Sequence, residues 1–230
     1  MIDARETAPG AAHRDMYLDE NGEVNRDLAV NGPTAGGIPG EVAGMYHLAE
    51  QYGKLPLSVS LQPAIRIARD GFPVDEKFRA LMGWRVETLR RWPAAAAAYL
   101  VDDDIPPLGH VIKLPDLAWV LEQVAERGAD GFYKGPVAEK LIEGVQAAGG
   151  IWTLSDLADY RVVEREPIRT TYRGYVLVTA PPPSSGGVAL AQILNIIEPW
   201  PINELDPVQR AHLLVEAMRR AYRDRAIYLG

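Results

Sequence analysis

Arg5 and Glu6 stand side by side in a stretch of small residues that ends at Pro9. The planar guanidinium of arginine offers a rigid fork that binds a carboxylate through two parallel hydrogen bonds. Arg5 therefore has the chemistry to bind a carboxylate. On these two residues alone, an exposed ion pair is the simpler interpretation.

A second stretch, residues 181–187, reads Pro-Pro-Pro-Ser-Ser-Gly-Gly and is called the proline–serine–glycine segment below. It follows a strand-like run and precedes a helix-like run that begins at Val188. Three prolines fix φ and remove three backbone donors, whereas serine hydroxyls can cap a helix that starts there. The pattern fits a stiff connection with a serine cap, and also a loop that approaches a substrate. Ser184 and Ser185 have no candidate base nearby in the sequence.

Other candidates for chemistry are weak. Asp102, Asp103 and Asp104 lack the alternating ligand spacing and the following glutamate of an EF-hand calcium loop, which favours a solvated loop. The four histidines show no close metal-binding spacing, and the absence of cysteine excludes thiolate nucleophiles and zinc–thiolate sites. No phosphate-binding or dinucleotide-binding glycine loop is present. We predict neither a metal nor a cofactor.

Composition narrows the class of protein. The 230 residues carry 31 acidic side chains against 24 Lys and Arg, a formal charge of −7, which argues against nucleic acid as a partner. No apolar run approaches the roughly 20 residues of a membrane span. Charge appears at once, at Asp3, so we expect no signal peptide in this chain.

The elements that must position these residues are mostly helices. Apolar side chains at helical spacing, with proline near the start and glycine at the end, predict helices over 39–53, 61–71 and 115–128. A fourth apolar stripe, from Ala138 to Val145, predicts a helix that Gly149 and Gly150 close. Further helices are expected over 76–91, around the alanine run 94–98, after Thr153 with Asp156 completing a capping box, over 188–197, and from Asp206 onward. The last of these is expected to have an apolar face formed by Val208, Ala211, His212, Val215, Met218 and Tyr222. Residues 1–38 are predicted to be loop with short extended pieces.

Strand character is confined to residues 168–172 and 175–179, joined by a turn at Arg173 and Gly174. The fold class is therefore α/β (α+β) and rich in helix. A sheet of two or three strands is small for this length, which indicates an incomplete sheet.

Several ordered motifs together resemble the γ-glutamyltranspeptidase family. They are residues 5–9 (Arg-Glu-Thr-Ala-Pro), 15–19, 36–44 (Gly-Gly-Ile-Pro-Gly-Glu-Val-Ala-Gly), 131–135, Asp156 with Leu157 and Tyr160, 172–174, and the proline–serine–glycine segment. The resemblance extends over essentially all 230 residues, and motifs that occur in this order are far more specific than any one of them alone.

The resemblance implies an N-terminal-nucleophile hydrolase with an αββα sandwich, made as a precursor that cleaves itself into two subunits. The new N-terminal threonine of the small subunit attacks the amide of γ-glutamyl substrates such as glutathione, with its own α-amino group as the base. The acyl group then passes to water or to an acceptor amino acid or peptide. The family resemblance also implies a periplasmic or extracellular location.

Carried over residue by residue, the resemblance assigns Arg5 to the substrate α-carboxylate and Glu6 to the orientation of Arg5. The proline–serine–glycine segment matches a motif of the large subunit and not the serine pair of the oxyanion hole, which belongs to the small subunit. The catalytic threonine is expected beyond Gly230, and Thr170 and Thr171 are not candidates for it. Residues 1–230 are thus expected to be an internal part of the large subunit, truncated at both ends and inactive alone.

Two alternatives remain open from the sequence. The first is the cephalosporin-acylase branch of the same family, which acts on a glutaryl amide; a terminal carboxylate in either substrate would suit Arg5. The second is a non-catalytic helical interaction module, which would be stable, monomeric and free of large exposed apolar faces.

Overall fold

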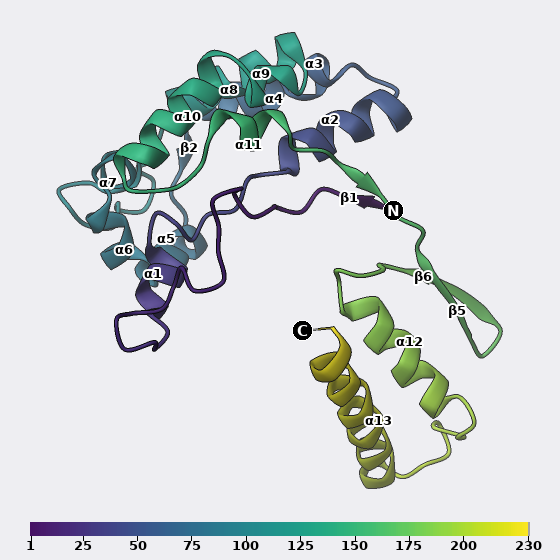
Figure 1. Cartoon of the computed structure of the whole chain (residues 1–230). Coiled ribbons are helices and arrows are strands. Elements are labelled where there is room, and N and C mark those ends of the chain that lie inside the picture. Colours follow the sequence, from purple (N-terminus) through teal and green to yellow (C-terminus); the bar gives the residue numbers. More distant parts are fainter. Residues whose placement is uncertain (230) are drawn as a thin grey trace. The chain divides into compact units, whose positions relative to one another are not determined.

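The chain forms two compact units in the computed structural model. The first unit, residues 4–162, consists mostly of short helices (Figure 1). The second unit comprises residues 1–3 and 163–229, and the structure describes residues 1–229 in all. No helix among these residues is both long and apolar enough to cross a bilayer.

The first unit is a set of helices with one minimal sheet. The helices are α1 (Arg26–Asn31), α2 (Glu41–Tyr52), α3 (Leu57–Ser60), α4 (Gln62–Asp70), α5 (Glu76–Gly83), α6 (Val86–Arg91), α7 (Pro93–Tyr99), α8 (Pro115–Arg127), α9 (Asp130–Tyr133), α10 (Pro136–Ala147) and α11 (Leu154–Ala158). Strands β2 (Phe72–Pro73) and β3 (Val111–Ile112) pair antiparallel.

The helices with clear apolar periodicity form as predicted, within one or two residues at their ends. Helices α4 and α8 both stop at a glycine with positive φ, Gly71 at 98° and Gly128 at 63°. A side chain is strained in that conformation, so glycine ends each helix cleanly. Helix α2 also matches its predicted range, and α10 contains the predicted apolar stripe and begins two residues before it.

Two predictions for this unit are wrong. Residues 26–31 form α1, where loop was expected: Asn25 caps it by accepting from Leu28 N at 3.0 Å, and Arg91 binds both oxygens of Asp27. The single helix expected over 76–91 is split into α5 and α6. There the amides of Trp84 and Arg85 donate to carbonyls only three residues back, which tightens the last turn and ends α5.

The second unit contains a β-hairpin and a helix pair. Strands β5 (Ile168–Tyr172) and β6 (Tyr175–Thr179) pair antiparallel about a turn in which Arg173 and Gly174 both have positive φ, as predicted. Strands β1 (Ile2–Asp3) and β4 (Val163–Glu164) form a second antiparallel pair. Helices α12 (Gly186–Ile197) and α13 (Pro207–Tyr228) lie alongside each other (Figure 1).

The start of α12 differs from the sequence prediction. The helix begins at Gly186, two residues early, and Ser185 makes no capping hydrogen bond through its side chain. Its hydroxyl instead accepts a hydrogen bond from Arg225 Nε at 2.9 Å. The hydroxyl therefore binds α13 and does not cap α12. A Cβ at Gly187 would lie 2.0 Å from the carbonyl oxygen of Ala180, so this close helix-to-strand approach requires glycine.

Helix α13 begins as predicted, with Asp206 accepting from the amides of Val208 and Gln209. Its packing face is different, because the buried residues are Ala217 and Ala221. Small alanine side chains allow the close approach to α12 that long ones would prevent. The predicted apolar stripe is largely exposed: Val208, Val215, Met218 and Tyr222 are each between 44% and 77% accessible.

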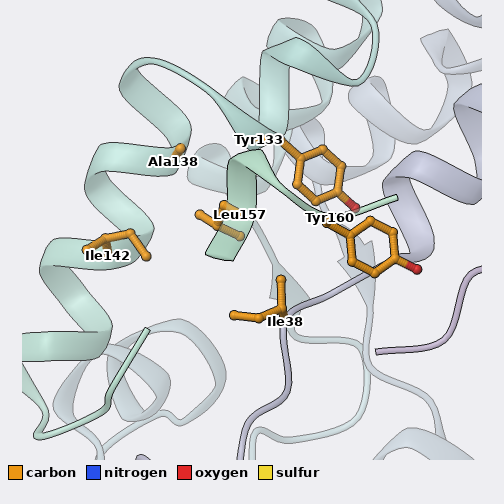
Figure 2. Packing of buried hydrophobic residues seen from close by; sticks show 6 residues of the cluster. All are labelled: Ile38, Tyr133, Ala138, Ile142, Leu157 and Tyr160. Atoms are coloured by element: carbon orange, nitrogen blue, oxygen red, sulfur yellow. The ribbon is translucent and has the colours of Figure 1, made fainter. Parts of the chain in front are cut away.

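The main core of the first unit is a cluster of six buried side chains, Ile38, Tyr133, Ala138, Ile142, Leu157 and Tyr160 (Figure 2). They come from α9, α10, α11 and the chain just after it, and from the chain just before α2. A second cluster joins Leu61, Ile65 and Val124 across α4 and α8. With three two-stranded sheets among residues 1–229, the described structure is helix-rich α+β.

Helix α11 starts with the predicted capping box. Thr153 Oγ1 accepts from Asp156 N, and Asp156 Oδ2 accepts from Thr153 N at 2.8 Å. The other carboxylate oxygen, Oδ1, accepts from Gly10 N at 2.8 Å. Desolvation raises the pKa of Asp156, but the hydrogen bonds from Gly10 and Thr153 outweigh it and hold the pKa below its ordinary value of 3.8.

We predict that Asp156→Ala lowers the free energy of unfolding by about 1–2 kcal/mol at pH 7, since it removes a helix cap and a loop anchor. Because folding lowers this pKa, the stabilisation is full above about pH 4 and is lost as the pH falls through the folded-state value. Urea unfolding at pH 7 and pH 3 measures it, with Asp159→Ala as the control. An equal deficit at both pH values would contradict this origin.

Gly40 offers a steric test of the core. Its φ of −108° suits any residue, but an added Cβ would lie 1.9 Å from Tyr160 Oη and 2.3 Å from the carbonyl oxygen of Ala4. Gly40→Ala should therefore lower the free energy of unfolding by about 1–3 kcal/mol. The matched control is Gly144→Ala within α10, where a Cβ meets nothing within 4 Å and should stabilise by about 0.5–1 kcal/mol. Thermal unfolding of both variants gives the comparison, and a neutral Gly40→Ala would refute the close contact.

Candidate functional site

The Arg5–Gly10 segment crosses the first unit beside the chain that leads into α2. Thr7 and Ile38 form an isolated antiparallel bridge, with Ile38 N donating to Thr7 O at 2.8 Å and Thr7 N donating to Ile38 O at 3.2 Å. Gly37 allows this approach, because a Cβ there would lie 2.9 Å from Cγ of Glu6. The segment is thus paired to its neighbour like a short piece of sheet.

Two further hydrogen bonds hold the ends of this segment. Tyr160 Oη donates to the carbonyl oxygen of Arg5 at 2.8 Å, and Asp156 accepts from Gly10 N at its far end. Both partners come from α11 or the two residues after it. Every one of these anchors binds a main-chain atom, so these anchors do not depend on the side chains at positions 5 and 6.

Those two side chains face solvent. The Arg5 and Glu6 side chains are 59% and 61% exposed, and the closest guanidinium and carboxylate atoms, Arg5 Nη2 and Glu6 Oε1, are 3.7 Å apart. This distance is within ion-pair range but longer than a direct hydrogen bond. An exposed pair of this kind contributes about 0–1 kcal/mol, so its effect on folding is small.

Tyr160, which contacts this segment, stacks on Tyr133 with ring centroids 5.7 Å apart and an interplanar angle of 8° (Figure 2). Tyr133 Oη donates to the carbonyl oxygen of Pro39 at 2.7 Å and accepts from Ala43 N at 3.2 Å. Burial outweighs the hydrogen bond from Ala43 and raises the pKa of Tyr133 to about 12, so the phenol is neutral at physiological pH. Sequence reasoning noted Tyr160 only as part of a motif and missed its contact with Arg5.

A cavity of about 370 Å³ opens next to the tyrosine pair. Its lining mixes signs, with His47, Glu50, Lys134 and Arg161 beside the two tyrosines. Much of this charge is already compensated: Lys134 Nζ lies 2.9 Å from Asp130, and Arg161 donates to the carbonyl oxygens of Ala158 and Tyr160 at 2.7 Å. The cavity therefore has no strong net preference for an anion or a cation.

The proline–serine–glycine segment belongs to the other unit, so the site described around Arg5 comprises residues of the first unit alone. Within its own unit the segment forms a turn closed by Ser184 N donating to Pro181 O at 3.1 Å. Ser185 contacts Arg225, a permanently charged donor that cannot act as a base there. The Ser185 hydroxyl therefore has a structural contact with α13.

Residues 1–229 contain no group of three or more His, Cys, Asp or Glu side chains arranged to hold an ion. Asp103 and Asp104, the weak calcium candidates, lie 3.5 and 3.6 Å from the Arg90 guanidinium in a tight turn. Thr170 and Thr171 lie in the middle of β5, where both are paired with β6.

Comparisons with known proteins agree over the whole chain. The family model described as Gamma-glutamyltranspeptidase matches residues 1–230. A glutathione hydrolase proenzyme from Pseudomonas sp. (strain A14) is 40% identical over 232 residues, which cover 100% of this chain and 40% of that relative. The chain thus spans less than half the length of this curated relative.

Solved structures give the same result. The crystal structure of Helicobacter pylori gamma-glutamyltranspeptidase is 37% identical and superposes with a TM-score of 0.96, covering 100% of this chain and 66% of the other. A cephalosporin acylase from Bacillus halodurans is 28% identical, with a TM-score of 0.81 over 96% of this chain and 42% of the other. The fold expected from the sequence is confirmed, since these relatives share the N-terminal-nucleophile hydrolase fold. The chain belongs to the gamma-glutamyltranspeptidase family.

Proposed function

We propose that this chain is the substrate-carboxylate-binding part of the large subunit of an enzyme that cleaves γ-glutamyl amides such as glutathione. One observation carries the proposal: an exposed arginine stands on a backbone segment anchored at three points, Arg5 O, Thr7 and Gly10 N. Rigid support for an exposed guanidinium is what bidentate recognition of a carboxylate requires. The similarity to glutathione hydrolases supports the substrate class.

In the proposed reaction this chain binds and orients the substrate, and the small subunit of the same precursor supplies the nucleophile. Arg5 holds the α-carboxylate, so that the γ-carbonyl carbon is presented to the N-terminal threonine. The threonine oxygen displaces the amine, and the acyl-enzyme is then attacked by water or by an amino acid or peptide acceptor. Glu6, 3.7 Å from the guanidinium, restricts its orientation.

A second candidate substrate is a glutaryl amide. The similarity to the Bacillus halodurans cephalosporin acylase favours it, and a glutaryl group also ends in a carboxylate that Arg5 would bind. Identity is higher to the glutathione hydrolase, at 40% against 28%, which supports the γ-glutamyl assignment. Comparing kcat/KM for γ-glutamyl and glutaryl anilides on the complete enzyme separates the two.

The non-catalytic interaction module is less well supported. Such a module would bury its apolar surfaces, whereas Tyr175, Val176 and Val178 on β6 and the stripe on α13 are exposed. These exposed apolar surfaces support the proposal that the chain packs against further parts of an enzyme, including a small subunit. By the same family resemblance we propose a periplasmic or extracellular location.

We predict that Arg5→Lys in the complete enzyme raises KM for a γ-glutamyl anilide about 10-fold, because lysine cannot bind the carboxylate through two parallel bonds. A loss of about 1.4 kcal/mol corresponds to that factor. Because the Arg5 side chain is exposed, thermal stability should remain unchanged. Steady-state kinetics with varied donor concentration give the result.

Arg14→Lys is the matched control for this test. Arg14 is likewise exposed, and its Nε lies 3.8 Å from the carboxylate of its sequence neighbour Asp15. It should leave KM unchanged. Equal kinetics for the Arg5 and Arg14 variants would show that Arg5 does not bind the substrate.

A further inference from the structure

The backbone that carries the exposed Arg5 side chain accepts a hydrogen bond from Tyr160. Tyr160 is 8% exposed, and its hydroxyl donates to the carbonyl oxygen of Arg5 at 2.8 Å. That carbonyl carbon is bonded directly to Cα of Arg5, from which the guanidinium extends. The position of the phenol therefore determines where the arginine side chain originates.

The phenol itself has little freedom to move. Its ring stacks on Tyr133, and Tyr133 is fixed in turn by hydrogen bonds to Pro39 O and from Ala43 N. On another side, the backbone of Gly40 approaches so closely that a Cβ would lie 1.9 Å from Tyr160 Oη. Tyr160 also follows α11, whose capping box fixes the start of that helix.

Arg5 and Tyr160 are 155 residues apart in the chain, so this contact connects the carboxylate-binding segment to the core. The Thr7–Ile38 bridge and the Gly10–Asp156 bond hold the segment further along. The hydrogen bond from Tyr160 reaches the very residue that carries the guanidinium. Removing it takes one anchor from Arg5 and leaves the Thr7–Ile38 bridge and the Gly10–Asp156 bond in place.

We propose that Tyr160 is a positioning residue for recognition of the substrate carboxylate, and that it acts through the main chain of Arg5. The inference rests on the proposed function, in which Arg5 binds that carboxylate. Two parallel hydrogen bonds demand accurate placement of the guanidinium, so a small shift at Cα weakens substrate binding. Tyr160 itself does not contact the substrate.

The test is Tyr160→Phe in the complete enzyme, which keeps the stacked ring and removes only the donor. KM for a γ-glutamyl anilide should rise about threefold to tenfold, while kcat at saturating donor stays within about twofold, because the nucleophile is untouched. Tyr17→Phe is the matched control, since Tyr17 Oη also donates to a main-chain carbonyl, that of Thr34, at 2.8 Å. Both variants lose one comparable hydrogen bond, but only the first should change KM.

A double-mutant cycle identifies the route of the effect. In an Arg5→Ala background, Tyr160→Phe should produce no further rise in KM, because the group that it positions is gone. An undiminished rise in that background would overturn the proposal, as would an unchanged KM for Tyr160→Phe alone. If Arg5→Lys also leaves KM unchanged, the proposed function fails; if only Tyr160→Phe does, the failure is confined to the positioning role.

A second variant covers the case in which Tyr160→Phe does not yield folded protein. Difluorotyrosine at position 160 keeps the donor at low pH and loses it when the more acidic phenol ionises. Over the pH range in which its phenolate absorbance appears, KM of this variant should rise relative to the unmodified enzyme. Parallel pH profiles across that range would contradict the role of the hydroxyl, because a purely structural contribution of the ring does not titrate.

Discussion

The structure around the candidate site depends on two buried phenolic hydroxyls that require hydrogen-bond acceptors. Burying a hydroxyl without a hydrogen bond costs about 1–3 kcal/mol, so Tyr133 and Tyr160 are stable in their stack only if carbonyl oxygens come to them. Those oxygens belong to Pro39 and Arg5. One requirement of the core thereby fixes two stretches of main chain at once, one before α2 and one that carries the arginine.

The glycines of residues 36–44 follow from the same constraint. The main chain at Gly40 lies so close to Tyr160 that a Cβ there would be 1.9 Å from its Oη. At Gly44 a Cβ would lie 2.5 Å from the Cβ of Ala4. The glycines of this family motif therefore have a packing role, because they make room for the tyrosine pair and the Arg5 segment. The capping box of α11 completes the arrangement, because Asp156 binds Gly10 with the oxygen that the cap leaves available.

Sequence reasoning succeeded where the determining interactions are local. Helices α2, α4, α8 and α10, the α11 cap and the β5–β6 turn depend on spacing and on residues within a few positions. It failed where a distant partner decides the outcome: Arg91 supports α1, Arg225 takes the hydroxyl of Ser185, and α12 selects the alanine face of α13. At the site, the resemblance assigned Arg5 and Glu6 to substrate binding, and that assignment stays a prediction. The support from Tyr160 was invisible, because nothing in the sequence relates residues 155 positions apart.

Folding and ligand recognition make different demands on the Arg5 segment, and the structure assigns them to different atoms. The anchors bind the carbonyl of Arg5, both backbone groups of Thr7 and the amide of Gly10, so they hold for almost any side chain at positions 5 and 6. The identities of Arg5 and Glu6 are then available for recognition at little cost in stability. The anchors also limit how far the root of the arginine can move, and this compensates for the flexibility of its long side chain. An exposed arginine on an unanchored loop would lose backbone conformational entropy when the ligand binds. A buried arginine would have lost its hydration before the ligand arrived.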